Sequence, residues 1–162
     1  MRFNDSQKGF SLIELLIVVA VIGVIAAIAV PNLLASRRAA NEGSALSAMR
    51  TIHSAQVTYL NTAGSGEYGT LATLGSEGLV DSALGNGLRS GYTFDCPAGN
   101  KTKGPPPTYF ATAVPTSTAA VARTGHRTFV ITDDGRIRSK VTDAGPANYA
   151  TATNNGTWPV LN

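Results

Sequence analysis

Cysteine is almost absent from this sequence, because Cys96 is the single one among 162 residues. An intramolecular disulfide is therefore impossible, and a metal site built from several cysteines is excluded. A lone cysteine of this kind is more often a buried thiol than a reactive one. We expect the chain to be stabilised by packing or by assembly with other copies.

Charged residues are also scarce and nearly balanced. The sequence has 13 Lys and Arg against 10 Asp and Glu, which gives a formal net charge of +3. This excess is too small to make nucleic acid the default partner. Basic residues do outnumber acidic ones between Arg89 and Lys140, and the simplest interpretation is a solvated face of a β-domain. The alternative is a patch that binds DNA weakly through Arg123, Arg127, Arg136, Arg138 and Lys140.

The motifs on which many enzymes depend are missing. There is no Gly-rich phosphate loop after a strand, no Gly-x-Ser-x-Gly nucleophile elbow and no His and Cys cluster at metal-ligand spacing. The two histidines are His53 and His126, and Asp133 and Asp134 are best explained by a turn. We therefore expect that the chain is not an enzyme and that it holds no metal and no cofactor.

What the sequence does contain is one long apolar run near its amino terminus. Leu15 to Val30 includes no polar side chain, and with Phe10 to Ile13 the stretch reaches the roughly 20 residues that span a bilayer. Glu14 interrupts it. An ionised carboxylate in a membrane costs about 2.5–3.5 kcal/mol on insertion scales, so it should be neutralised or paired. No Lys or Arg lies between Phe10 and Ser36 to pair with it.

Three interpretations of this segment are open. The first is a secretory signal with Leu15 to Ala26 as its apolar region and cleavage at Ala27-Ile28-Ala29. The second is a permanent single-span anchor, whose flanking basic residues are too evenly matched to fix its orientation. Neither accounts for Glu14. In the third, cleavage between Gly9 and Phe10 creates an α-amino cation that pairs with the carboxylate in low-dielectric surroundings.

The third interpretation coincides with a family resemblance. Residues 8–14, Lys-Gly-Phe-Ser-Leu-Ile-Glu, followed by the apolar run and Pro31, resemble the prepilin motif of type IV pilins and type II secretion pseudopilins. The resemblance implies that a prepilin peptidase cuts after Gly9, that Phe10 becomes the N-methylated first residue, and that Glu14 is needed for assembly. The leader of residues 1–9 is similar to the short leaders of type IV pilins.

Two residues of the apolar run are expected to weaken a helix. Pro31 removes one backbone hydrogen bond and clashes with the preceding turn, and Gly23 has low helix propensity. In similar pilins the helix loosens between an equivalent Gly and Pro when the subunit enters the fibre. The resemblance therefore implies that residues 23–31 melt in the filament, and a simple kink is the alternative.

Helical spacing continues beyond Pro31. One stripe at intervals of three and four consists of Ala45, Met49, Ile52, Gln56 and Tyr59, and it is widened by Leu46, His53 and Leu60. The Gly-Ser-Gly sequence at residues 64–66 is a stop signal. We expect a helix from Ser11 to about Ala63, with a transmembrane or filament-core half at residues 10–35 and an amphipathic half at residues 36–63.

The remaining residues, 64–162, predict a small head domain. Alternating apolar residues indicate strands at 91–96, 108–115 and 127–132, and Asp133-Asp134-Gly135 is a hairpin signal that returns the chain through residues 136–138. An antiparallel sheet of three or four strands packed on the distal half of the helix is the simplest arrangement. The fold class is thus α+β and type IV pilin-like. The segment from residue 144 onward is expected to be a tail pinned by Trp158.

The resemblance implies a structural subunit, most simply the major pilin of a bacterial type IV pilus. Such a subunit is held in the inner membrane by one span, is processed by prepilin peptidase, and is polymerised by the assembly machinery of the inner membrane into an extracellular helical homopolymer. The nearest alternative is a minor pilin or a pseudopilin of a type II secretion or DNA-uptake system. A less favoured one is a secreted soluble binding module with an ordinary signal peptide.

Overall fold

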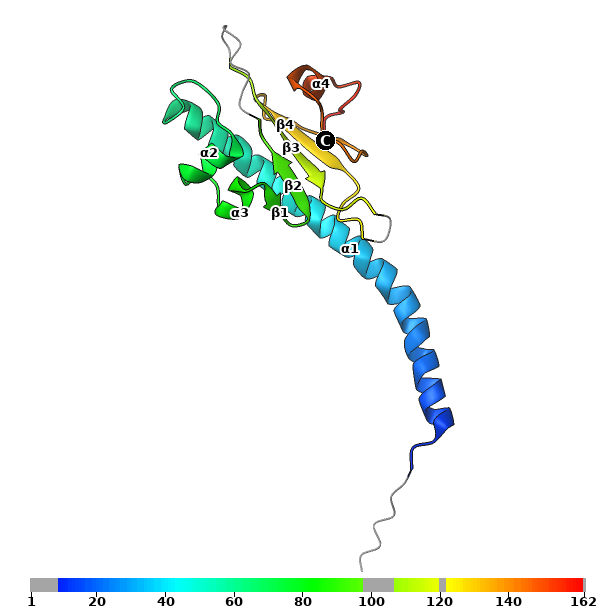
Figure 1. The fold of residues 1–162 in the computed structure, drawn as a ribbon. Helices are drawn as coiled ribbons and strands as arrows, with labels where there is room; N and C mark the ends of the chain where they lie inside the picture. Colours follow the sequence, from blue (N-terminus) through cyan, green and yellow to red (C-terminus); the bar gives the residue numbers. More distant parts are fainter. Residues whose placement is uncertain (1–8, 98–106, 120–121, 162) are drawn as a thin grey trace, which may run out of the picture. The chain divides into compact units, whose positions relative to one another are not determined.

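The computed structural model describes residues 9–97, 107–119 and 122–161. The chain divides into two compact units, residues 1–36 and residues 37–162. Helix α1, Leu12–Asn61, supplies most of the described part of the first unit and continues into the second (Figure 1). The leader up to residue 8 lies outside the described residues. The predicted functional boundaries at residues 9, 35 and 63 stay predictions.

In the first unit, α1 presents apolar side chains in every direction. Between Leu12 and Leu33, the exposed fraction of its large apolar residues ranges from 48% for Val18 to 81% for Leu12. By length and composition this helix is able to cross a membrane. It continues without interruption through Gly23 and Pro31. The helix of the single chain is therefore intact at both predicted weak points.

The second unit is built around one antiparallel sheet, whose strands follow each other in sequence order. They are β1 Leu88–Arg89, β2 Tyr92–Asp95, β3 Phe110–Pro115, β4 Thr128–Thr132 and β5 Ile137–Lys140. Each strand therefore pairs with the strands that precede and follow it in the sequence. The α+β prediction is confirmed, and so are the expected strands at 91–96, 108–115 and 127–132.

The sheet has five strands where three or four were expected, and the additional strand is β1. This strand is only two residues long and has no alternating pattern. It pairs with β2 through Arg89 and Tyr92 across a two-residue turn, Ser90-Gly91. Both turn residues have positive φ, 48° and 72°, as in the type I′ turns that match the twist of a hairpin. Serine is an uncommon residue in this conformation, which is why the turn carried no sequence signal.

The carboxy-terminal half of α1 packs on one face of this sheet. Its buried side chains lie at the predicted helical spacing and are Ala45, Ala48, Met49, Ile52, Ala55 and Gln56. The sheet contributes alternate residues such as Ala111, Phe129 and Ile131 to the same core. Alanines on both elements let the helix approach the strands closely. The buried Gln56 amide exchanges two hydrogen bonds with the backbone of Gly69, which ties the following loop to the helix.

The opposite face of the sheet is covered by the carboxy-terminal segment (Figure 1). Helix α4, Tyr149–Thr153, and Trp158 pack there against Val130, which points away from α1. Leu161 then donates a backbone hydrogen bond to Ile137 at the edge of the sheet. Trp158 is 3% exposed, so the tail is pinned as expected.

Two short helices, α2 Leu71–Ser76 and α3 Ser82–Gly85, connect α1 to the sheet. Each begins at a capping side chain: Thr70 accepts a hydrogen bond from the backbone N–H of Thr73, and Asp81 accepts one from Leu84. Leu74 and Leu84 are fully buried against the common core.

Candidate functional site

The predicted cleavage position lies outside α1. Gly9 and Phe10 are not helical, both are exposed, and Phe10 has 77% of its surface open. A side chain at Gly9 would meet no other atom within 4 Å. The peptide bond between these two residues is therefore in irregular, accessible backbone, which is what a peptidase needs in order to bind the chain.

Glu14 has a local partner that the sequence interpretation missed. Its Oε2 accepts a hydrogen bond of 3.0 Å from the backbone N–H of Ser11, the residue immediately before α1. The Ser-x-x-Glu spacing is that of a capping box, in which the carboxylate satisfies a free N–H at the helix start. A negative charge near this end is also favoured by the helix dipole. Glu14 is thus stabilised in its apolar surroundings before any α-amino group is available.

The signal for this contact was in the sequence. Ser11-Leu12-Ile13-Glu14 preceding an apolar run is itself the capping pattern. The same pattern is thus consistent with two roles of Glu14, helix capping and the expected role in assembly. The two roles are compatible, since the same carboxylate oxygen can accept from Ser11 or from an amine at residue 10.

The helix surface around Glu14 is the largest apolar surface among the described residues. Its members are exposed on all sides, from Leu12 through Leu33. Contiguous apolar surface of this extent marks contact with a membrane or with other proteins. Gly23 has open space around it, and Pro31 lies within the helix. The melting of residues 23–31 in a filament stays a prediction.

The predicted basic patch must be corrected at Arg138. This residue is 3% exposed, and its guanidinium donates to Asp134 and to Thr132 at 2.7 Å each. Desolvation alone would raise the pKa of Asp134, but hydrogen bonds from Arg138, Thr132 and the backbone of Arg136 hold it at about 2. Arg138 therefore joins the β4–β5 hairpin to the core, and it is not available to DNA.

Most of the other predicted patch residues are also engaged. Arg123 forms an ion pair with Asp143 at 2.7 Å, and Arg127 forms one with Glu42 at 2.9 Å. The Lys140 ammonium lies over the ring of Trp158. These contacts explain the local excess of basic residues as structure of the β-domain, and nothing in the described residues supports DNA as a ligand.

The remaining chemically active side chains do not form a catalytic centre in the part of the chain that the structure describes. Cys96 is 2% exposed, and burial raises its pKa to about 12, so it is the buried thiol that was expected. His53 contacts the hydroxyl of Tyr109, whereas His126 contacts Arg38. No group of three or more His, Cys, Asp or Glu within these residues is arranged to hold a metal ion.

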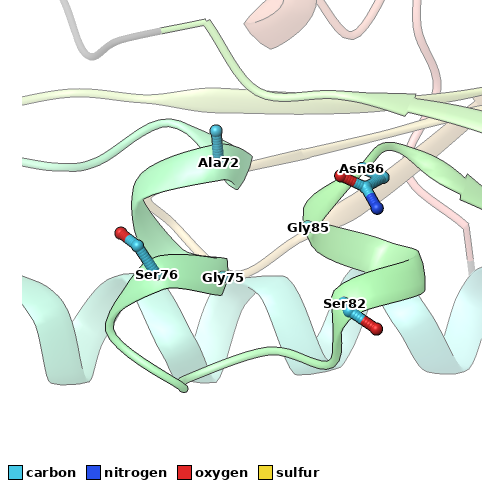
Figure 2. Close-up of a pocket in the computed structure, with 6 residues that line it drawn as sticks. All are labelled: Ala72, Gly75, Ser76, Ser82, Gly85 and Asn86. Carbon is cyan, nitrogen blue, oxygen red and sulfur yellow. The ribbon is translucent and has the colours of Figure 1, made fainter.

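Figure 2 shows a shallow hollow between α2 and α3. Its volume is about 210 Å³, and it is lined by Ala72, Gly75, Ser76, Ser82, Gly85 and Asn86. The close approach of Gly75 to Gly85 sets its floor, because a methyl group at either position would lie 3.2–3.3 Å from the other residue. No acid, base or nucleophile other than serine hydroxyls faces it, which leaves it without catalytic chemistry.

Comparison with known proteins supports the amino-terminal interpretation. A family model described as a prokaryotic N-terminal methylation motif matches residues 4–30. The chain is 40% identical over 60 residues to the type IV major pilin protein PilA of Myxococcus xanthus, which is 37% of this chain and 27% of that protein. It is 60% identical over 37 residues to the type IV wide pilus major component PilA4 of Thermus thermophilus, covering 23% and 28%.

A third relative belongs to a secretion system. The type II secretion system core protein G of Escherichia coli is 37% identical over 59 residues, which is 36% of this chain and 41% of that protein. The chain thus spans between about a quarter and two fifths of the length of the curated relatives it matches. No solved structure matches it. These relatives are components of pili and of a secretion system, and the similarity confirms the prediction that the chain is not an enzyme.

Proposed function

The amino-terminal region of this chain is that of the type IV pilin and pseudopilin superfamily, and from that premise we propose that the protein is the major subunit of a type IV pilus. Before assembly it is held in the inner membrane by the apolar half of α1. Prepilin peptidase cleaves it after Gly9 and methylates Phe10, and the assembly machinery polymerises it into an extracellular homopolymeric filament. The proposal extends to the whole chain a similarity that covers residues 4–30 for the methylation motif and 23–37% of the chain for the individual relatives.

The observation that carries this proposal is the position of Glu14 within a fully exposed apolar helix. Each large apolar side chain that is buried contributes about 1.5–3 kcal/mol relative to water, so this helix must lie in lipid or against other helices. Lipid is as apolar as a bundle of such helices, and apolar burial alone therefore does not favour the filament over the membrane. Packing and polar pairing must supply the difference.

Glu14 is suited to provide that polar pairing. In the present chain it accepts one hydrogen bond from Ser11. Cleavage after Gly9 would create an α-amino cation at Phe10, one residue away from this donor. A charge pair in a low-dielectric environment is strongly favoured over two unpaired charges. Pairing of Glu14 with its own or a neighbouring Phe10 amine would then fix the axial register of the subunits.

The first experiment measures the intact mass of the mature subunit purified from cells. Cleavage after Gly9 with one added methyl group supports the proposal. Loss of residues 1–29 would identify the less favoured alternative, a secreted soluble module with an ordinary signal peptide, and would overturn the proposal.

The second experiment tests Glu14 directly. Glu14→Ala should leave cleavage intact and abolish extended surface fibres, since the unpaired amine would be buried in the filament core. Glu14→Gln is the matched control for shape: it keeps a hydrogen-bond acceptor for Ser11 and loses the charge. Normal fibres from both variants would remove the register argument.

A pseudopilin of a type II secretion system is the second candidate, and the similarity to core protein G favours it. A minor pilin, or a subunit of a DNA-uptake system, differs from the major pilin in copy number and partners and has the same local chemistry at Glu14. Imaging of surface fibres in the native cell separates these cases. Long fibres in which this subunit is the dominant mass support the major pilin, and their absence during active secretion supports the pseudopilin.

A further inference from the structure

Arg38 is in an unusual electrostatic position. Its Nη1 lies 2.8 Å from Nε2 of His126, and its Nε is shielded from solvent with no hydrogen-bond partner among the described residues. Four other arginines of this unit form ion pairs with carboxylates. Arg38 instead contacts an imidazole. Because a guanidinium only donates, Nε2 of His126 must accept and its ring must be neutral.

The nearest carboxylate on the same helix face is already engaged. Glu42 lies four residues after Arg38, a spacing at which oppositely charged side chains usually pair. Its Oε1 accepts instead from the backbone N–H groups of His126 and Arg127, and its Oε2 accepts from the Arg127 guanidinium. Both carboxylate oxygens of Glu42 therefore accept hydrogen bonds from the loop before β4. The charge of Arg38 has no counter-ion among the described residues. Buried polar groups without partners are rare and call for an explanation.

The position of Arg38 along α1 indicates the missing partner. It lies three residues beyond Ala35, where the apolar stretch that begins at Phe10 ends. Those 26 residues would extend about 39 Å as a helix, whereas the hydrocarbon core of a bilayer is about 30 Å thick. The end of the stretch, and Arg38 just after it, would thus fall in the layer of lipid headgroups. This step rests on the proposed residence of the subunit in the membrane.

Two further donors are close in sequence or in space. Arg37 is exposed and has no hydrogen bond or ion pair with the described residues. His126 is exposed, and a neutral ring that accepts at Nε2 carries its proton on Nδ1, where it can donate. Guanidinium groups match the oxygen geometry of phosphate, and they are weakly hydrated enough to bind it in partly buried sites.

We propose that Arg37 and Arg38, with His126 beside them, bind the phosphate group of a phospholipid headgroup. The phosphate supplies the acceptor that Arg38 Nε lacks and the negative charge that Glu42 no longer provides. Binding fixes the depth at which the subunit waits in the membrane, and it must be broken when the subunit is extracted. Each arginine near an anionic membrane surface is expected to strengthen lipid binding about fivefold.

The test uses the full chain labelled with ¹³C at the arginine Cζ atoms and reconstituted into vesicles of phosphatidylglycerol and phosphatidylcholine. Solid-state NMR measures the loss of arginine ¹³C signal through dipolar coupling to lipid ³¹P. Arg37→Gln and Arg38→Gln should each reduce this loss, and the double variant should reduce it most. Arg50→Gln is the matched control, because Arg50 is exposed on the same helix about 18 Å further along. It should leave the coupling unchanged.

The outcomes separate this inference from the proposed function. Flotation of the protein with the vesicles reports membrane residence by itself, and failure to float would contradict the proposed function. A floating protein whose coupling is the same in the wild type and the double variant would overturn the phosphate site alone. A parallel sample in maltoside micelles with inorganic phosphate distinguishes a free anion: coupling there, with none in vesicles, would overturn the assignment to lipid. Arg37 is exposed and forms no hydrogen bond or ion pair with the described residues, so Arg37→Gln is expected to fold and keeps the test valid.

Discussion

The two units of this chain differ in where their stabilising partners lie. In the second unit, residues 37–162, which joins the distal half of α1 to the predicted head domain and is called the head from here on, side chains such as Met49 and Phe129 are fully buried by other parts of the same chain. In the amino-terminal unit, equally apolar side chains are exposed, and in the proposed function the surfaces that bury them belong to lipid or to other subunits. The clearest sequence motif, residues 8–14, therefore lies next to the side chains that have the fewest partners within the single chain. We interpret such a motif as a sign of contacts with partners outside the chain.

The largest effect that separates the two units is expected from a matched pair of isoleucines on α1. Ile52 has no exposed surface in the head, whereas Ile17 is 55% exposed in the other unit. Ile52→Ala should lower the free energy of unfolding of the head by about 2–5 kcal/mol, since it removes packing and leaves a cavity. Ile17→Ala should change it by less than about 0.5 kcal/mol. Urea titration of the full chain in detergent measures both, and equal effects would contradict the division.

Arg138 provides a second large effect, which is confined to the head. Arg138→Met removes the guanidinium that donates to Asp134, Thr132 and Asn155, and it leaves Asp134 with only the hydrogen bonds from Thr132 and from the backbone of Arg136. We expect a loss of about 2–4 kcal/mol in the free energy of unfolding, as for other broken buried networks. Arg136→Met, two residues earlier and exposed, is the control and should be nearly neutral. An equally small effect at Arg138 would show that the hairpin does not depend on this ion pair.

The pH dependence of the head should follow from the same ion pair. The pKa of Asp134 is lowered from 3.8 to about 2 in the folded chain, so its stabilising contribution is complete above pH 4 and is lost as the pH falls toward 2. Thermal unfolding of the full chain measured between pH 5 and 2 should show this loss. Asp134→Asn should make the curve flatter over that interval. A curve of unchanged steepness would place the acid sensitivity elsewhere.

Thiol reactivity gives a smaller, qualitative distinction. Cys96 lies in the core of the head, and burial raises its pKa to about 12. At pH 8 the thiol should react with iodoacetamide only after unfolding, since the thiolate is the reactive form. Mass spectrometry before and after urea treatment measures the modification. Rapid labelling of the folded chain would show that the head opens locally around β2.

Periodic and motif-based features could be predicted from the sequence, and features that depend on three-dimensional neighbours could not. The helix, the strand pattern and the Asp133-Asp134-Gly135 hairpin all follow from local spacing, and the structure has them. The burial of Arg138 does not, because a basic residue in a charge-rich stretch usually faces solvent and its partners lie across a turn and in the carboxy-terminal segment. β1 was missed because two residues carry no periodicity. The contact between Arg38 and His126 joins residues 88 positions apart.

The smallest expected effect concerns the start of α1, where Glu14 has a local contact with Ser11 and a proposed contact in the filament. Ser11→Ala retains the backbone N–H that Glu14 accepts from and removes only the side chain of the residue that precedes the helix. It should cost about 1 kcal/mol of local helix stability, and the effect should be confined to the first turn of α1. Hydrogen exchange of the amides in that turn, in the full chain in vesicles, measures it. Ser36→Ala, another serine on α1 but within the helix, is the control.

Because the proposed filament contact of Glu14 needs an amine and not a serine side chain, Ser11→Ala should still form fibres. Fibre loss with Ser11→Ala would mean that the Ser11 side chain takes part in assembly, since the backbone N–H that Glu14 accepts from is still present in this variant.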